Sequence, residues 1–433
     1  MKTALILVNM VISPVVNAEV ISFADVWAKI KQNSPSIARE GHALQASTFA
    51  KSRLALHWLP SLSLGAAAFS TNDPAVHFVS TLAQRQISLG DFSPASLNQP
   101  GNHLLETAAL GIDVPLFQGG LKVAQFEAQN KMQEAQSYKQ KTELLREFVD
   151  AALSYTSLLS YSVAEERLSA LAAQVADLIT RYSIGRKSNP VGYSGLLGLK
   201  SLKNRIAGEQ LSFQSKNRSI KGTLSEKMQI NNQEWSPTPD NAIVFLERTV
   251  SPKSEAQPSL VELHHQAQAD AVAAMKNAEK ARFLPKVGLF ATEGLTHGER
   301  DTGTSFTGGL YLQWSLFNPE NINQVSEKEE LRLVAFSDVA ADKQSSRIAK
   351  KTLQLSEVTL KENLVLLAES EALLAEQAKV ASQLFRTGSI SALQLAEVLN
   401  RRVDLILNLL TSEQDLIEVR GKRMMLSNPE GVN

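Results

Sequence analysis

The sequence predicts an α+β fold made of two internal repeats, each with a helix, two strands and a long helical hairpin. Three observations predict it. Apolar and small polar residues alternate in SLSLGAAAF and SFTGGLYLQWSLF, which is typical of strands. Two stretches, from about Leu121 to Tyr182 and from about Asn321 to Arg386, lack proline and glycine and predict helices on the order of 90–100 Å long. The same order of elements then occurs twice.

Residues 1–18 are typical of a secretory signal. MKTALILVNMVISPVVNA starts with Lys2, continues with an apolar stretch and ends on the small or modest residues at which a signal peptidase cuts. The alternative is an ordinary buried first element. The sequence contains no cysteine, so neither a lipoprotein anchor nor a disulfide framework is expected. After the signal, no apolar run reaches the roughly 18 residues of a transmembrane helix.

The first repeat is expected over 19–225. An amphipathic helix ends in HWLP, a strand follows Pro60, and a long loop leads to TAALGIDVPLFQGG and the first long helix. The chain then turns at RYSIG and returns as a helix. Gly192, Gly195 and Gly198 lie three apart in this returning helix, each at a cost of about 1 kcal/mol relative to alanine. They indicate either an unusually close helix contact or a pliable segment.

The second repeat is expected over 259–420, after an irregular connection at 226–258 and before a tail at 421–433. Four prolines in the connection exclude a continuous helix. The second repeat contains a helix, the strand entered after Pro285, SFTGGLYLQWSLFNPE, a long helix, a turn at FRTGS and a last helix through Asp415. Corresponding positions are Leu59-Pro60 and Leu284-Pro285, Leu116-Phe117 and Leu316-Phe317, and Gly185 and Gly388.

The alternation of the strands fits a membrane as well as a soluble sheet. Apolar residues share one face of each strand, and small or polar residues share the other, as a bilayer-spanning strand requires. A half-buried hairpin on a soluble sheet is the alternative. Four strands are too few to close a barrel, so a membrane-spanning arrangement requires an oligomer. The apolar positions are Leu62, Leu64, Ala66, Ala68, Phe306, Leu310, Leu312, Trp314 and Leu316.

Proline and glycine mark the corners between strands and helices. Pro115 is expected at a strand end, where one missing ladder donor is tolerable. Gly119 and Gly120 then let the backbone turn without a Cβ clash. In the second repeat Asn318-Pro319 lies beyond the strand, and the proline opens the helix instead.

Composition and motifs argue against other classes of protein. The chain has 44 basic and 44 acidic side chains, so it lacks the basic excess of a nucleic-acid-binding protein. It contains no phosphate-binding loop, no HExxH and no nucleophile elbow, so we expect neither an enzyme nor a cofactor. His264-His265 has no further ligand at metal-binding spacing, so no metal site is expected.

The order and spacing of these segments resemble the TolC family of outer-membrane export channels over nearly all of the mature chain. The resemblance is carried by SFADVWAKIKQNSPSI, the strands after Pro60 and Pro285, the VPLFQGG and WSLFNPE corners, RYSIG, and FRTGSISALQLAEVLNRRVDL. It implies a homotrimer in the outer membrane of a Gram-negative bacterium. Each protomer contributes four strands to a twelve-stranded β-barrel in outer-membrane lipid, continued by a long α-helical periplasmic barrel.

The resemblance also implies a function without catalysis. Family members are passive exit ducts for an inner-membrane pump and a periplasmic adaptor protein. Type I protein secretion is an alternative to efflux of small molecules or metals. A periplasmic coiled-coil scaffold or adaptor without a pore is the alternative of another class.

Two regions of the helical hairpins correspond to functional positions of the family. Two acidic residues usually follow the last glycine turn, and here those positions are Gln394 and Glu397. Three copies of Glu397 imply a carboxylate ring that favours cations, although a solvated helical glutamate is the alternative. Phe385 and Ile390 stand where some members hold the gate with tyrosine and arginine. The turns Ile184-Gly185-Arg186 and Gly388-Ser389-Ile390 correspond to the adaptor-docking tips.

Overall fold

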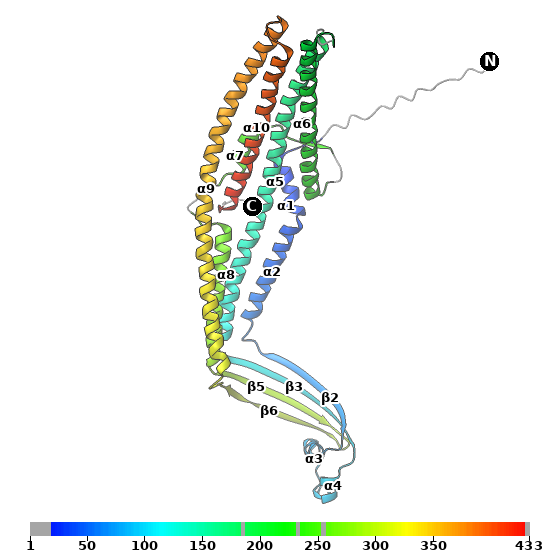
Figure 1. Ribbon diagram of the computed structural model, residues 1–433. Helices are drawn as coiled ribbons and strands as arrows, with labels where there is room; N and C mark the ends of the chain where they lie inside the picture. The colour runs from blue at the N-terminus through cyan, green and yellow to red at the C-terminus, as the bar shows by residue number, and fades with distance from the viewer. Residues whose placement is uncertain (1–18, 183–186, 231–233, 253–256, 429–433) are drawn as a thin grey trace, which may run out of the picture. The chain divides into compact units, whose positions relative to one another are not determined.

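The structure, a computed structural model, describes residues 19–182, 187–230, 234–252 and 257–428. The expected signal at 1–18 lies outside the described residues. The chain within these ranges forms six strands, ten α-helices and two short 3-10 helices (Figure 1). They divide into two compact units. We call the described parts of 1–41, 138–263 and 342–433 the helical unit, and those of 42–137 and 264–341 the sheet unit.

The two predicted long helices are present and run without interruption. Helix α5 (Leu121–Arg181) has 61 residues and α9 (Pro319–Arg386) has 68. Each contributes its second part to the helical unit. The other elements of this unit are β1 (Glu19–Ile21), α1 (Phe23–Asn33), α6 (Pro190–Met228), β4 (Trp235–Pro237), α7 (Ala242–Thr249) and α10 (Ala392–Met425).

Apolar residues three and four apart on α10 form the main hydrophobic packing surface of the helical unit. Leu395, Leu399 and Val403 are fully buried, and they belong to one cluster with Leu199 and Ile206 of α6. Residues of α5 complete this cluster, which includes Leu168, Leu171 and Val175. The burial of this stripe holds the helices together, because helix propensity alone stabilises a helix only weakly.

Two of the three glycines that lie three apart in α6, Gly195 and Gly198, are in close contact with α10. A methyl group added to Gly195 would stand 2.6 Å from the Cβ of Ala392, and one added to Gly198 would stand 3.3 Å from a methyl of Leu393. Gly192 is also buried. Of the two explanations that the sequence allows for these glycines, close helix contact is therefore the one that the structure supports.

The last helix continues ten residues beyond the predicted end at Asp415 and enters the expected tail. A buried ion network explains the extension. Arg420 of α10 donates to Glu357 of α9 at 2.7 Å and to the carbonyl of Val250 at 2.6 Å, and Arg423 donates to the second Glu357 oxygen at 2.5 Å. Removing one partner from such a buried pair leaves an uncompensated charge. Both arginines reach Glu357 because α10 continues as a helix past Arg423.

The described parts of the connection at 226–258 contain regular elements. Helix α6 extends into it as far as Met228, β4 pairs in parallel with β1, and α7 follows with its N-terminus capped by Asn241. The buried Trp235 of β4 donates its indole N–H to the Ser225 hydroxyl at 2.9 Å. A strand of three residues has too short a pattern to be recognised in the sequence, and its pairing partner lies more than 200 residues away.

The sheet unit is built on one four-stranded antiparallel sheet, which Figure 1 shows as a continuous curved layer. Its strands follow the order β2-β3-β5-β6. Their bounds are β2 (Ser61–Thr71), β3 (His103–Gln118), β5 (Lys286–His297) and β6 (Thr302–Gln313). Helices α2 (Pro35–Ala55) and α8 (Leu260–Lys280) precede the two pairs of strands, while α3 (Pro74–Ala83) and α4 (Pro94–Asn98) lie between β2 and β3. In the described part of the chain, no helix has the length and apolarity needed to cross a membrane.

Two strand ends differ from the prediction. Strand β6 stops at Gln313, so Trp314 and Leu316 lie beyond it. The last pair is Lys286 with Gln313, and Pro285, the residue before β5, has no N–H to continue the ladder. The indole of Trp314 instead donates to the carbonyl of Phe283 at 3.0 Å.

Strand β3 runs three residues past Pro115, which was expected at its end. Pro115 faces Gly288 of β5, and the register shifts between Pro115 and Phe117. On the other side β2 begins at Ser61, which pairs with Asp113, so Pro115 has a strand on one side only. A proline is tolerated at such an edge or bulge because no ladder donor is lost.

The close contact between α6 and α10 predicts opposite effects for two alanine substitutions in α6. Gly195→Ala should lower the free energy of unfolding by about 1–3 kcal/mol, because the new methyl overpacks against Ala392. Gly208→Ala is the matched control, since nothing lies within 4 Å of its added methyl, and it should raise stability by about 0.5–1 kcal/mol. Denaturant unfolding followed by helical circular dichroism measures both. A stable Gly195→Ala variant would contradict the close contact.

Candidate functional site

The register of the sheet separates its residues into two chemically distinct faces. Residues that pair across neighbouring antiparallel strands point to the same side of the sheet. Leu64 pairs with Leu110, and Leu289 pairs with both Val114 and Leu310. The opposite face carries small and polar residues, including Ser63, Gly111, Thr292 and Thr307. The alternation predicted for single strands is thus continuous across the whole sheet.

The apolar face is exposed within the described chain. Leu64 is 77% exposed, Phe306 71% and Leu310 64%. A contiguous apolar surface of this kind marks a contact with lipid or with another macromolecule. Glu106 and Glu293 are charged exceptions on this face, both in the half of the sheet nearer the β5–β6 turn. Nothing in the structure explains Glu293.

Both outer edges of the sheet are unpaired in the described chain. Strands β2 and β6 each have one neighbouring strand, β3 and β5 respectively. Their free backbone N–H and C=O groups form a row that readily accepts a further strand. The sheet is therefore chemically incomplete at two edges as well as on one face.

The predicted corners lie at the same end of this sheet. Pro60 and Pro285 stand immediately before β2 and β5. Gly119 and Gly120 follow β3 with φ angles of +64° and +78°, in the left-handed region that favours glycine. Asn318 accepts a hydrogen bond from the Glu320 N–H at 3.0 Å and caps α9, so Pro319 opens this helix as expected.

The turn between α9 and α10 is built by glycine. Gly388 has a φ of +76°, and its N–H donates to the carbonyl of Phe385 at 3.1 Å. The N–H of Ser389 donates to the carbonyl of Leu384 at 2.8 Å. This pair of bonds is a Schellman motif, which satisfies the last carbonyls of α9. The other predicted tip, Ile184-Gly185-Arg186, lies outside the described residues.

The four positions that correspond to the family's gate have different surroundings. Gln394 forms a capping box with Ser391, whose N–H and hydroxyl donate to its side-chain oxygen at 2.9 and 3.1 Å. Phe385 and Ile390 are half-buried against the α5–α6–α10 core, where Phe385 packs against the ring of Tyr182 at 5.6 Å.

Glu397 is the only one of the four that carries a charge. Its carboxylate accepts from Arg401 one turn later on α10, at 3.2 Å, and its side chain is 60% exposed. The structure thus brings Phe385 and Ile390 into one apolar cluster, whereas Gln394 serves a helix end and Glu397 faces solvent.

The sequence analysis did not predict two polar features, namely a set of polar bonds between α6 and α10 and a polar pocket. Arg205 of α6 binds both Asn400 and Asp404 of α10 across the helix pair. No local pattern identifies it, because its partners are almost 200 residues away. The second is a polar pocket formed by the segment between β2 and β3, which was predicted as a plain loop. Asp73-Pro74 and Ser93-Pro94 are cap-then-proline signals that could have identified the two helices of this segment.

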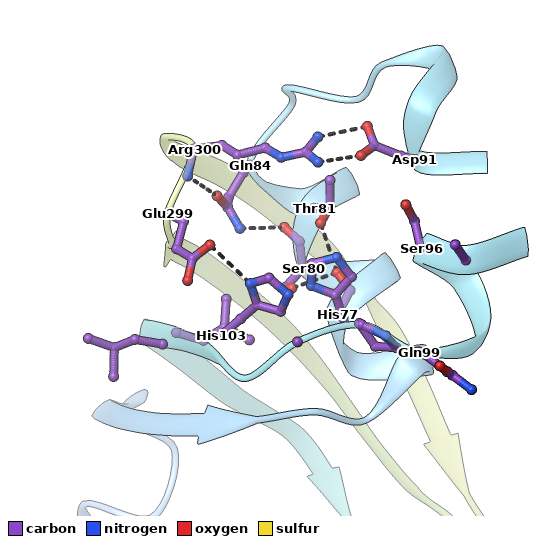
Figure 2. Close-up of a pocket in the computed structure, with 15 residues that line it drawn as sticks. His77, Ser80, Thr81, Gln84, Asp91, Ser96, Gln99, His103, Glu299 and Arg300 are labelled. Atoms are coloured by element: carbon purple, nitrogen blue, oxygen red, sulfur yellow. Dashed lines mark hydrogen bonds and ion pairs between the residues drawn. The ribbon is translucent and has the colours of Figure 1, made fainter. Parts of the chain in front are cut away.

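Figure 2 shows this pocket, a cavity of about 390 Å³ in the sheet unit. Its walls come from α3, a 3-10 helix (Leu89–Phe92), α4, the start of β3 and the β5–β6 turn. Arg300 reaches across to both carboxylate oxygens of Asp91, and the rings of His77 and His103 lie one against the other. In the residues that the structure describes, no group of three or more His, Cys, Asp or Glu side chains is arranged to hold a metal ion.

Comparison with known proteins identifies the fold. No family model matches the chain, and no curated protein matches it in sequence. CusC, described as forming a transmembrane channel, matches with a TM-score of 0.77 at 11% identity, over 94% of this chain and 92% of its own. The outer-membrane protein VceC of Vibrio cholerae matches with a TM-score of 0.73 at 13% identity, over 94% and 96%.

A third match is the CmeC outer-membrane channel of Campylobacter jejuni, with a TM-score of 0.74 at 11% identity, over 95% of this chain and 87% of its own. The chain therefore has the fold of outer-membrane channels of the TolC type. The resemblance expected from the sequence is confirmed at the level of the fold.

The corner after β3 predicts a ranking of two substitutions. Gly120→Ala should destabilise by about 1–2 kcal/mol, because alanine is strained at a positive φ. Gly119→Ala should destabilise by more, because its methyl would also collide with the carbonyl oxygen of Ala281. Unfolding midpoints in denaturant measure the difference. Equal losses would show that the Ala281 contact imposes no restraint.

Proposed function

We propose that this protein is a passive exit duct in the outer membrane of a Gram-negative bacterium. It works as a homotrimer that receives substrates from a periplasmic adaptor and an inner-membrane pump. In this arrangement, the four strands of each protomer join those of two other copies in a twelve-stranded barrel. The long helices of three copies enclose the periplasmic part of the duct.

The sheet is the observation that carries this proposal. One face is apolar and exposed, the other is small and polar, and both edges lack a partner. Backbone groups in a bilayer must be paired, so an open sheet in lipid has to close. Strand β6 of one copy would run antiparallel to β2 of the next, since neighbouring strands already alternate in direction. Lipid would then cover the apolar face, and the polar face would line the duct.

The hairpin turns supply the proposed contact with the adaptor. Gly388, Ser389 and Ile390 form a compact reversal in which the N–H groups of Gly388 and Ser389 bind the carbonyls of Phe385 and Leu384. These bonds fix the end of α9 beside the start of α10. The corresponding first tip would include Ile184, Gly185 and Arg186.

The proposed duct has a gate at Glu397, close to the hairpin turn. Three copies would place three carboxylates around the axis, each beside Arg401 of its own helix. A ring of carboxylates favours cations over anions. Gln394, Phe385 and Ile390 would support this ring by fixing the start of α10 and its packing, and no enzymatic step is involved.

Purified protein should form channels in planar lipid bilayers. We expect a detergent-extracted trimer that produces discrete conductance steps, because three sheets close a water-filled passage. A periplasmic scaffold without a pore would instead stay in the aqueous fraction and give no conductance. That second outcome would exclude the duct and favour the scaffold.

Replacing Glu397 should change the ion selectivity of the channel. Glu397→Ala removes the carboxylate and leaves Arg401 without its partner, so the preference for cations should fall, as measured by reversal potentials in a salt gradient. Glu418→Ala is the matched control, since Glu418 is equally exposed on α10 and pairs with Lys422 at the same spacing. Selectivity that is unchanged in both variants would exclude the carboxylate ring.

A further inference from the structure

Residues 72–102, which connect β2 to β3, form a folded segment that we call the strap. It contains α3, a 3-10 helix (Leu89–Phe92) and α4. Both α-helices begin with a capped proline turn, in which Asp73 and Ser93 accept backbone N–H groups. The strap leaves the sheet from the β2 edge, yet α3 contacts β6 at the opposite edge. It therefore spans the strand ends of the whole sheet.

Specific polar bonds hold the strap to the β5–β6 turn. The Gln84 side-chain oxygen accepts the backbone N–H groups of Arg300 and Asp301, at 3.1 and 3.3 Å. Arg85 donates to the carbonyl of Thr304 at 2.7 Å. Arg300 of the turn also binds Asp91 of the strap. One guanidinium nitrogen donates to a carboxylate oxygen at 2.7 Å, and the other nitrogen binds the second carboxylate oxygen. The strap is thus fastened at several points of its length.

A pair of histidines lies at the centre of this contact (Figure 2). His77 of α3 stacks on His103, the first residue of β3, with ring centroids 4.0 Å apart and planes 24° apart. His103 is bound through Nδ1 to Glu299 of the β5–β6 turn at 3.0 Å. The charged groups that act on His77 are His103 from β3, Glu299 and Arg300 from the turn, and Asp91 from the 3-10 helix.

The contact accommodates a neutral His77 better than a protonated one. Burial lowers the pKa of His77, and electrostatic interaction with His103 and Arg300 lowers it further, against the opposing effect of Asp91 and Glu299. The Asp91 carboxylate is already engaged by Arg300, so it is a poor partner for a new cation. A released His77 binds a proton more readily than a docked one. The docked strap is therefore fully stable above the ordinary histidine pKa of about 6.5 and loses stability as the pH falls below it.

We propose that the strap is an acid-released latch in which His77 is the titrating group. Above neutral pH the stacked rings hold α3 against the start of β3, and the Arg300–Asp91 pair holds the 3-10 helix on the β5–β6 turn. Protonation of His77 adds a cation beside His103 and Arg300 and frees residues 72–102. Given the proposed duct, whose outer mouth would lie at these strand ends, release would change access to that mouth.

Hydrogen–deuterium exchange of the detergent-solubilised full chain tests the latch. Peptides that cover residues 74–98 are compared at about pH 7.5 and about pH 5, after correction for the intrinsic pH dependence of exchange. Wild-type protein should exchange several-fold faster in this segment at the lower pH, while β5 and β6 stay protected. His77→Phe keeps a ring for stacking but cannot titrate, so its strap should stay protected at both pH values.

Two controls sharpen the assignment. His297→Gln removes a neighbouring histidine that bonds Thr302 outside the pocket, and it should keep the wild-type pH response. Asp91→Asn breaks the pair with Arg300 and should exchange rapidly at both pH values. The proposal is overturned if wild-type exchange is independent of pH, or if His77→Phe responds as the wild type does. Because exchange does not require a pore, the conductance measurements can fail or succeed independently of this result.

Discussion

The unpaired backbone of the two outer strands is the constraint on which the rest of the structure depends. Strands β2 and β6 each present a row of donors and acceptors without a partner in the described chain, and the face between them is apolar. An unpaired strand edge and an exposed apolar face both favour association in water. Pairing the edges alone would leave the apolar face exposed. In the proposed duct, association of copies would pair these edges and contact with lipid would cover the face, so folding of the sheet would be coupled to assembly.

The helical unit meets the opposite requirement, because its apolar residues are already buried within one chain. Side chains of α5, α6, α9 and α10 form a core, and the Gly195–Ala392 contact brings α6 and α10 unusually close. Arg205 adds polar bonds across the same pair of helices. The hairpin end of α10 is therefore attached firmly to α6. A movement of α10 at the proposed gate would have to carry α6 with it or separate this contact.

Local sequence patterns predicted most of the fold and the corners, but they did not predict contacts between residues that are far apart in the sequence. Helix lengths, strand alternation, and the glycines at positions 119, 120 and 388 each follow from residues that are close in sequence. The end of β6 depends on Pro285, which precedes another strand, and the extension of α10 depends on Glu357 in another helix. The two helices of the strap have local signals in Asp73-Pro74 and Ser93-Pro94, whereas its contact with the β5–β6 turn does not, since Asp91 and Arg300 meet only after the sheet has formed. Among the proposed gate positions, Gln394 and Glu397 were assigned by their distance from Gly388, whereas the capping role of Gln394 depends on Ser391 and the start of α10.

The two prolines that precede β2 and β5 have a further consequence for the size of the sheet. Each proline lacks a backbone N–H just before the first paired residue, which is Ser61 in β2 and Lys286 in β5. The hydrogen-bonded ladder therefore does not extend beyond these two residues. In this way the backbone itself sets the lower limit of the apolar band, independently of which side chains it carries. The two prolines thus define one boundary of the paired sheet. In the proposed duct they would fix one boundary of the sheet that lipid covers, and a membrane whose thickness did not match the sheet would have to deform around the protein.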